Sequence, residues 1–154
     1  MDFSLLISNK LINAGVVSWV TAQVLKTIID LIKNKHFNRK RLSGAGGMPS
    51  SHSAITCSLM LTTLLEYDFQ SPYFAITFIL AIIVMYDAAG VRYSAGLHAQ
   101  SINRLVNHFS ESEDMPELQE LIPDLNESLG HRLIEVICGA LLGFSISLIL
   151  YFVI

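Results

Sequence analysis

The sequence predicts an all-α fold, a small integral membrane helical bundle with about four spans and one amphipathic interfacial helix. Of its 154 residues, 52% are hydrophobic and only 15% are charged, and the mean hydropathy is +0.51. Apolar stretches of helical length recur along the chain and alternate with polar connections. The length suits one membrane-embedded domain over residues 1–154, and a net charge of −3 gives no reason to expect a nucleic-acid partner.

The predicted spans follow one another in the order 5–32, 49–67, 71–86 and 133–154. The last is the clearest, because its 22 residues include Glu135 as the only charge and reach about 33 Å as a helix, against about 30 Å of hydrocarbon. The second is long enough only if its helix begins near Pro49, and proline suits a first helical turn. The first span carries Lys10, Lys26 and Asp30, so its polar positions are expected to face protein.

Charge in the connections predicts the orientation of the spans. The connection 33–41 has five Lys or Arg and no acid, whereas 66–71 has two acids and no base. By the positive-inside rule the first is cytoplasmic, which places both termini outside and residues 87–132 inside. All the polar, chemically suggestive segments then lie on the cytoplasmic side of the cell (inner) membrane.

The predicted inner segment 87–132 has two parts. Apolar residues recur at every third or fourth place over 87–109, which predicts an amphipathic helix that lies at the interface or is partly inserted. Residues 110–127 are acidic, contain two prolines and lack an apolar period, so we expect a surface loop with at most a short helix.

The stretch "GGMPSSHSA", residues 46–54, stands at the entrance of the second span. A glycine-rich turn that leads into a helix N-terminus offers unpaired backbone amides to an anion such as phosphate. The candidate phosphate ligands are Gly46, Gly47, Ser50, Ser51 and Ser53. His52 could protonate a departing alkoxide near neutral pH. The simpler explanation also stands, in which the serines cap the helix and His52 is an interfacial histidine.

A second histidine lies in "LGHRLIEVICGALLG", where His131 and Glu135 share one helical face. The carboxylate can hold one ring nitrogen and leave the other free as a nucleophile, although a solvent-side His–Glu pair is the ordinary alternative. Gly139 and Gly143 continue this face, and such a small-residue surface could serve a homodimer as easily as an internal helix contact.

Together these motifs resemble the type-2 phosphatidic acid phosphatase and vanadium haloperoxidase superfamily. "MPSSHSA" is similar to its second signature, usually P-S-G-H-S, and "GHRLIE" is similar to the end of its third, H-x-x-x-D. The divergent bacterial and plant branch is closer still, because "GGMPSSHSA", "DAAGVR", "AG" and "LGH" recur there together. The resemblance covers residues 22–143 and implies a lipid phosphate substrate.

The resemblance also implies a role for each matching residue. His131 would attack phosphorus and form a phosphohistidine, Glu135 would orient it, and His52 would protonate the leaving oxygen. Ser50 and Ser51 would bind phosphate oxygens together with nearby backbone amides.

Two signatures of the superfamily are not intact in this chain. Asp124 and Leu125 stand where a Ser-Arg pair is usual, and no Arg-Pro follows the correctly spaced Lys26 and Lys33. A phosphate ester and its transition state need fixed cations. Arg92 is the first replacement candidate, followed by Lys26.

The basic residues could also have an acidic partner or a role other than phosphate binding. Asp87 could position one of them through a buried ion pair. Lys26 could instead extend to the interface. Arg39, Lys40 and Arg41 are interpreted as topology determinants and lipid contacts.

Two functions remain open at this stage. The first is an integral membrane phosphatase acting on a lipid phosphomonoester, of the phosphatidylglycerophosphate or phosphatidic acid type made on the cytoplasmic side. The second is a non-catalytic membrane scaffold or lipid-phosphate-binding protein. The sequence shows no zinc or two-metal pattern, so we expect chemistry without a metal or other cofactor.

Overall fold

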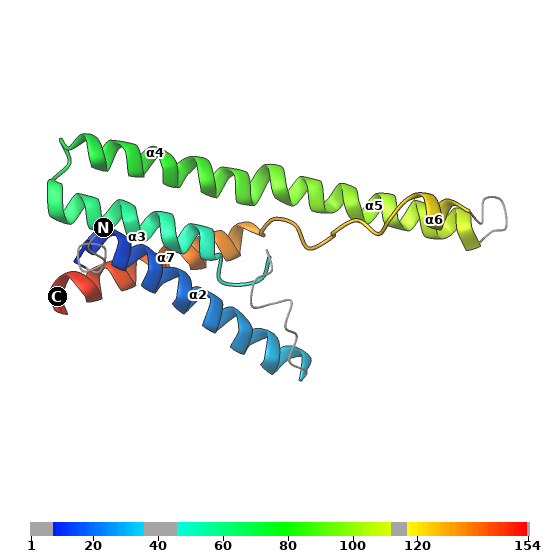
Figure 1. Ribbon diagram of the computed structural model, residues 1–154, viewed down its shortest axis with the longest axis horizontal. Helices are drawn as coiled ribbons and strands as arrows, with labels where there is room; N and C mark the ends of the chain where they lie inside the picture. The colour runs from blue at the N-terminus through cyan, green and yellow to red at the C-terminus, as the bar shows by residue number, and fades with distance from the viewer. Residues whose placement is uncertain (1–7, 36–45, 112–116, 154) are drawn as a thin grey trace.

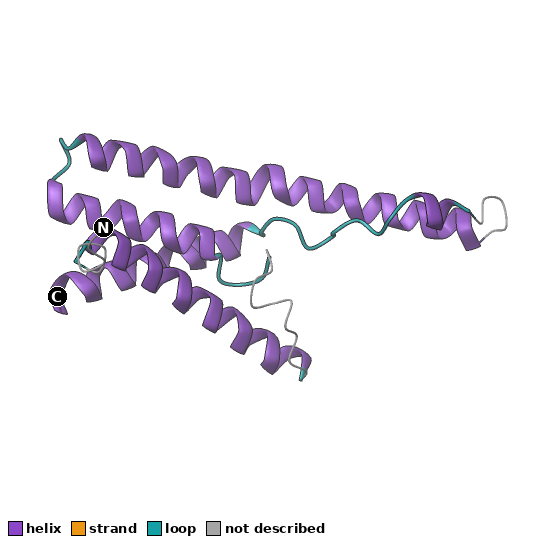
Figure 2. Cartoon of the chain, viewed as in Figure 1, coloured by secondary structure: helices purple, strands orange, loops and turns teal. Residues whose placement is uncertain are grey.

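A computed structural model describes residues 8–35, 46–111 and 117–153, and these residues form helices and their connections, with no strand (Figures 1 and 2). In chain order the helices are α2 (Lys10–Asn34), α3 (Ser51–Tyr67), α4 (Pro72–Tyr86), the π-helical turn η2 (Asp87–Val91), α5 (Arg92–Glu111), α6 (Leu118–Leu121) and α7 (Leu133–Val153). The predicted all-α fold is confirmed.

Three helical segments in the described part of the chain are long and apolar enough to cross a membrane: Lys10–Asn34, Pro72–Glu111 and Leu133–Val153. Most of their large apolar side chains point outward, as Ile76, Ile83 and Phe152 do. In water this surface would favour aggregation, whereas in a bilayer it faces lipid. The chain is therefore an integral membrane helical bundle.

Helix α3 is the central helix of this bundle. Its 17 residues reach about 25 Å, and it packs against α2, α4 and α7. Because protein surrounds it, α3 carries buried hydroxyl residues that a lipid-facing helix would not tolerate well, including Ser58, Thr62 and Thr63. Thr62 and Ser147 of α7 share a hydrogen bond of 2.8 Å.

The bundle has two distinct ends. The start of α2, the turn between α3 and α4 and the end of α7 lie at one end, while residues 46–50 and the segment after α4 lie at the other (Figure 1). This arrangement agrees with the predicted alternation of spans. We call the end with the start of α2 and the end of α7 the terminal end, and the end with residues 46–50 the site end.

The amphipathic helix exists, but it continues the third span instead of lying apart in the interface. α4, η2 and α5 form one segment of 40 residues, about 60 Å long, or twice the thickness of the hydrocarbon core. The buried side of α5, formed by Gly96, Ala99, Asn103 and Val106, faces the returning segment 117–131. Of its apolar positions, Ala99 and Val106 therefore pack against the chain itself, whereas Ile102, Leu105 and Phe109 stay exposed.

The glycines of α7 form an internal contact with α3. A Cβ atom on Gly139 would lie 2.3 Å from the Ser50 carbonyl oxygen, and one on Gly143 would lie 2.3 Å from that of Ala54. Only glycine permits this approach, so α3 occupies the surface that the sequence left open between an internal contact and a homodimer.

Candidate active site

The entrance of α3 is a tight turn closed by a serine cap. Gly46 and Gly47 have φ angles of 87° and 84°, which favour glycine, and a Cβ on Gly46 would lie 2.7 Å from the Ser128 carbonyl oxygen. The helix begins at Ser51, two residues later than the predicted start at Pro49, because Ser50 is the N-cap. The first-turn amides of α3, at Ser51 and His52, have no intrahelical acceptor.

The three serines of this entrance have different surroundings. Ser50 and Ser53 are fully buried, and the Ser53 hydroxyl donates to that of Ser50 at 3.0 Å. These two serines therefore cap the helix, which is the simpler of the two explanations given above for the serines of this stretch. Ser51 instead accepts a hydrogen bond of 3.5 Å from the Nζ atom of Lys26 on α2.

Lys26 is a buried cation. Only 3% of its surface is exposed, so its side chain lies within the protein and does not extend into solvent. Ionisable residues inside a membrane bundle are costly and usually functional. Lys26 lies close enough to act electrostatically on both His52 and His131.

The two predicted catalytic histidines face each other. Their ring centroids are 6.3 Å apart, and His131 Nδ1 lies 3.0 Å from Glu135 Oε2. His131 is 3% exposed, and its Nε2 atom is buried without a hydrogen-bond partner among the described residues. Burial lowers the pKa of His131, and its interactions with the Glu135 carboxylate and with the nearby Gly47 backbone oppose that shift. The neutral imidazole is therefore the favoured form near neutral pH.

A π-helical turn fixes the backbone of His131. In η2, Arg92 N–H bonds to Asp87 O where an α-helix would use Ala88 O, and Ala88 O accepts a 2.9 Å bond from His131 N–H. Gly130 makes this approach possible, because it has a φ of 80° and a Cβ there would lie 2.2 Å from Tyr93 N.

Asn103 of α5 is a positioning residue that the sequence did not indicate. Its amide nitrogen donates to Leu125 O and to Glu127 Oε1, both at 2.9 Å, and its oxygen accepts from Leu125 N at 3.0 Å. Gly96 lets the same segment pass close by, since a Cβ there would lie 2.6 Å from Leu129 O. Gly96 and Gly130 belong to the motifs "AG" and "LGH", which the sequence shares with the divergent branch and which therefore pointed to them. A single asparagine on a helix belongs to no such motif.

Arg92 and Asp87 lie beside the histidines. They form the predicted ion pair, although both partners are partly exposed instead of buried, with side-chain exposures of 48% and 37%. A cavity of about 90 Å³ has His52, His131, Asp87 and Arg92 in its walls, together with Val84, Ala88 and Gly130. This space admits a group of a few atoms and excludes a whole lipid.

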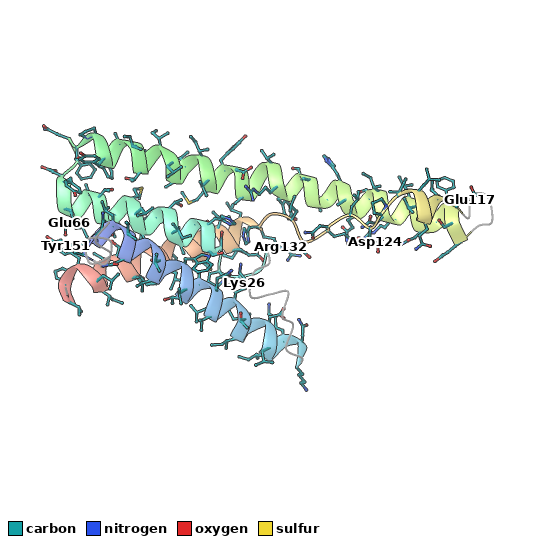
Figure 3. The ribbon with its side chains drawn as sticks, in the orientation of Figure 1. Lys26, Glu66, Glu117, Asp124, Arg132 and Tyr151 are labelled. Atoms are coloured by element: carbon teal, nitrogen blue, oxygen red, sulfur yellow. The ribbon has the colours of Figure 1, made fainter. Side chains whose placement is uncertain are left out.

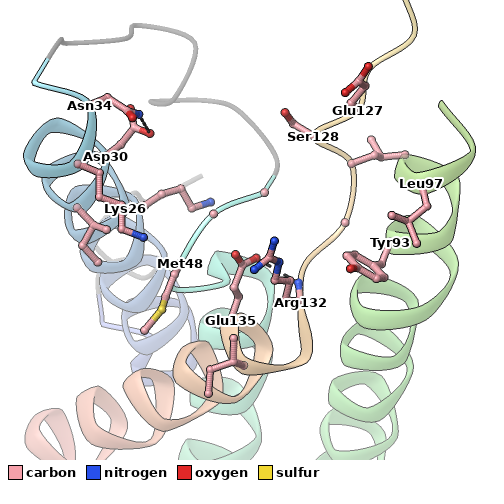
Figure 4. Close-up of a pocket in the computed structure, with 17 residues that line it drawn as sticks. Lys26, Asp30, Asn34, Met48, Tyr93, Leu97, Glu127, Ser128, Arg132 and Glu135 are labelled. Atoms are coloured by element: carbon pink, nitrogen blue, oxygen red, sulfur yellow. Dashed lines mark hydrogen bonds between the residues drawn. The ribbon is translucent and has the colours of Figure 1, made fainter. Parts of the chain in front are cut away.

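A larger cleft of about 620 Å³ lies next to this cavity, and Gly130 lines both spaces. Figure 4 shows this cleft. Lys26, Gly46, Gly47 and Glu135 line it, so the predicted site residues fall around two neighbouring cavities. Figure 4 shows α2 and α5 as opposite walls, with the start of α7 between them.

Two further sequence predictions concern the basic connection and metal binding. The basic residues Arg39, Lys40 and Arg41 lie outside the described part of the chain. Among the residues that are described, no group of three or more His, Cys, Asp or Glu side chains could hold a metal ion.

Comparison with known proteins gives two similarities. The sequence model of a family described as the divergent PAP2 family matches residues 7–146. The chain is also 38% identical over 151 residues to the uncharacterized membrane protein YuiD of Bacillus subtilis (strain 168), covering 94% of this chain and 96% of that protein. No solved structure matches the chain significantly.

Proposed function

Because this chain belongs to the divergent PAP2 family, we propose that it is an integral membrane phosphatase that hydrolyses a lipid phosphomonoester through a phosphohistidine. One observation carries the proposal: His131 presents a buried, unpartnered Nε2 beside His52, while Glu135 holds its Nδ1. Buried polar atoms are rarely left without a partner, and a reacting phosphorus would supply one.

The proposed reaction takes place in two steps. His131 Nε2 attacks phosphorus, the bond from phosphorus to the lipid oxygen breaks, and protonated His52 gives its proton to that oxygen. A water molecule then attacks the phosphohistidine, gives a proton to His52 and releases phosphate, which restores neutral His131. Glu135 keeps the ring in the tautomer that attacks.

The charge on the phosphoryl group requires cations, and two are in place. Arg92 lines the small cavity, and buried Lys26 lies near both histidines. First-turn amides of α3 and the Ser51 hydroxyl complete the proposed oxyanion contacts. Asp124, which stands in a lost signature, lies out along α5, away from Lys26 (Figure 3), so the cations come from other elements.

The site is proposed to open to the cytoplasm. Lys33 and Lys35, at the start of the basic connection, lie at the site end of the bundle, and basic connections stay inside. Lipid phosphates made on that side, of the phosphatidylglycerophosphate or phosphatidic acid type, are the substrates we expect. A reporter fused into residues 68–71 should be found outside; a cytoplasmic signal would reverse the orientation.

Phosphate release from purified protein tests the activity. Wild-type protein should release phosphate over time from lipid phosphomonoesters, His131→Ala should not, and His98→Ala, an exposed histidine on α5, should match wild type. Protein denatured during turnover should carry acid-labile phosphate on His131. No release and no trapped phosphate, in protein that still binds phosphatidic acid, would favour the non-catalytic scaffold or lipid-binding protein.

An activated substrate separates the two histidines. A p-nitrophenolate leaving group needs little protonation, so His52→Ala should lose far less activity on such a substrate than on a lipid phosphate. His131→Ala should abolish the activity on both substrates. Vanadate should inhibit competitively, and EDTA should have little effect. An activity that EDTA removes and magnesium restores would contradict the mechanism.

A further inference from the structure

The large cleft contains two cations that the proposed hydrolysis leaves unused. Lys33 lies on the last turn of α2 and Arg132 directly follows His131, and both line the cleft. Neither side chain makes a hydrogen bond or an ion pair with another residue in the part of the chain that the structure describes. The Arg132 side chain points into the cleft (Figure 4).

The acids of the same cleft are bound to other donors. Asp30 accepts from the Asn34 amide at 3.0 Å, and Glu127 accepts from that of Asn103 at 2.9 Å. Glu135 accepts from His131 and from the backbone N–H of Arg132. Because these carboxylates have donors within the protein, Lys33 and Arg132 are the groups left to meet an anionic ligand.

The cleft and the small cavity are separate but adjacent. Gly130 belongs to the walls of both, and Glu135 of the cleft holds His131 of the cavity. A ligand whose phosphoryl group lies between the histidines would therefore extend its remaining headgroup past Gly130 toward Lys33 and Arg132.

We propose that Lys33 and Arg132 form a second anion subsite, which binds a phosphate in the headgroup of the lipid. This inference rests on the proposed function, and it selects substrates in which a short polyol joins the scissile phosphomonoester to a second phosphate. A diphosphate fits less well, because its two phosphorus atoms share one bridging oxygen and would both need to lie in one cavity.

Competing lipids test the subsite. The ratio of kcat/KM for phosphatidylglycerophosphate to that for phosphatidic acid, with matched acyl chains, should favour the former in wild type. Lys33→Gln and Arg132→Gln should each lower this ratio about fivefold to tenfold, mainly through KM, because each removes one charge-assisted contact. Arg132→Gln keeps the backbone N–H that Glu135 uses.

A neighbouring lysine provides the control. Lys35→Gln removes an exposed cation two residues away, outside the lining of the cleft, and should leave the ratio unchanged. If the kcat/KM ratio of the two lipids is the same in wild type and in both variants, the subsite is rejected. Phosphate release by the wild type would still support the phosphatase in that case. If wild type prefers a lipid diphosphate and Lys33→Gln removes that preference, the inference that a polyol separates the two phosphates is wrong.

Binding without turnover separates the two proposals. Glycerol bisphosphate should raise the Tm of purified wild type more than glycerol monophosphate does, and Arg132→Gln should remove the difference. This result together with no hydrolysis of any lipid would leave the subsite and reject the phosphatase. Equal Tm shifts by both compounds would reject the subsite whatever the activity.

Discussion

At each end of the bundle a lysine of α2 lies against α3, but in different surroundings. At the terminal end Lys10 lies 2.9 Å from Glu66, with side-chain exposures of 47% and 26%. At the site end Lys26 (Figure 3) is 3% exposed and donates to the Ser51 hydroxyl. It also lies close enough to act electrostatically on His52 and His131. Burying a charge is expensive, so this contrast supports the proposal that the site end carries the chemistry while the terminal end is structural.

The largest expected effect concerns the close contact of α7 with the start of α3, at the site end. Gly139→Ala should cost about 3 kcal/mol of stability, because the new Cβ would lie 2.3 Å from the Ser50 carbonyl oxygen and would force α7 away from α3. Thermal unfolding in detergent measures this. Gly90→Ala is the control, since a Cβ there meets no atom within 4 Å. An unchanged Tm for Gly139→Ala would show that the helices pack less closely.

Removing a cation at the site end should have the next largest effect. Arg92→Ala should reduce turnover of a lipid phosphate about 100-fold, since one transition-state charge partner contributes about 3 kcal/mol. Arg104→Ala, an exposed arginine on α5, should stay within about threefold of wild type. An Arg92 variant with full activity would transfer this role to Lys26.

Loosening the segment before His131 should have a smaller effect. Asn103→Ala removes three hydrogen bonds that hold Leu125 and Glu127, and we expect kcat to fall about tenfold with little change in KM. Asn107→Ala, an exposed asparagine one turn later, should leave kcat unchanged. Faster amide hydrogen exchange over residues 125–131 should accompany the loss only in Asn103→Ala; its absence would contradict a positioning role.

The pH dependence should show that His131 is buried. Catalysis needs neutral His131, and burial lowers its pKa, so the acid limb of kcat/KM should lie below the ordinary imidazole value of about 6.5. Activity is lost as the pH falls through this pKa, because the protonated ring cannot attack. An acid limb above 7 would contradict the assignment of His131 as the nucleophile.

The smallest effects are expected at the terminal end. Lys10→Gln or Glu66→Gln breaks a partly exposed ion pair, which contributes less than about 1 kcal/mol. Tm should fall slightly and phosphate release should stay within about twofold of wild type. A large loss of activity would show that the two ends are coupled and would remove the contrast between them.

The sequence by itself determined the all-α membrane bundle, the alternation of its spans and the pairing of His131 with Glu135. Hydrophobic length decides which segments cross the bilayer. The four-residue spacing brings Glu135 within 3.0 Å of His131, although His131 lies two residues before α7 begins and so does not share its helical face. Ser50 as a helix cap was likewise a local property, readable from a serine before an apolar run.

Only the tertiary structure decided the features that depend on contacts between distant segments. It places His52 opposite His131, buries Lys26 against Ser51, joins α5 to the third span and assigns Gly139 to α3. Composition and period could not show that Gly96, Ala99 and Asn103 of α5 face residues 117–131, because an amphipathic pattern does not report what covers each side of a helix. Asn103 shows this best, since its two partner residues, Leu125 and Glu127, lie 22 and 24 residues away.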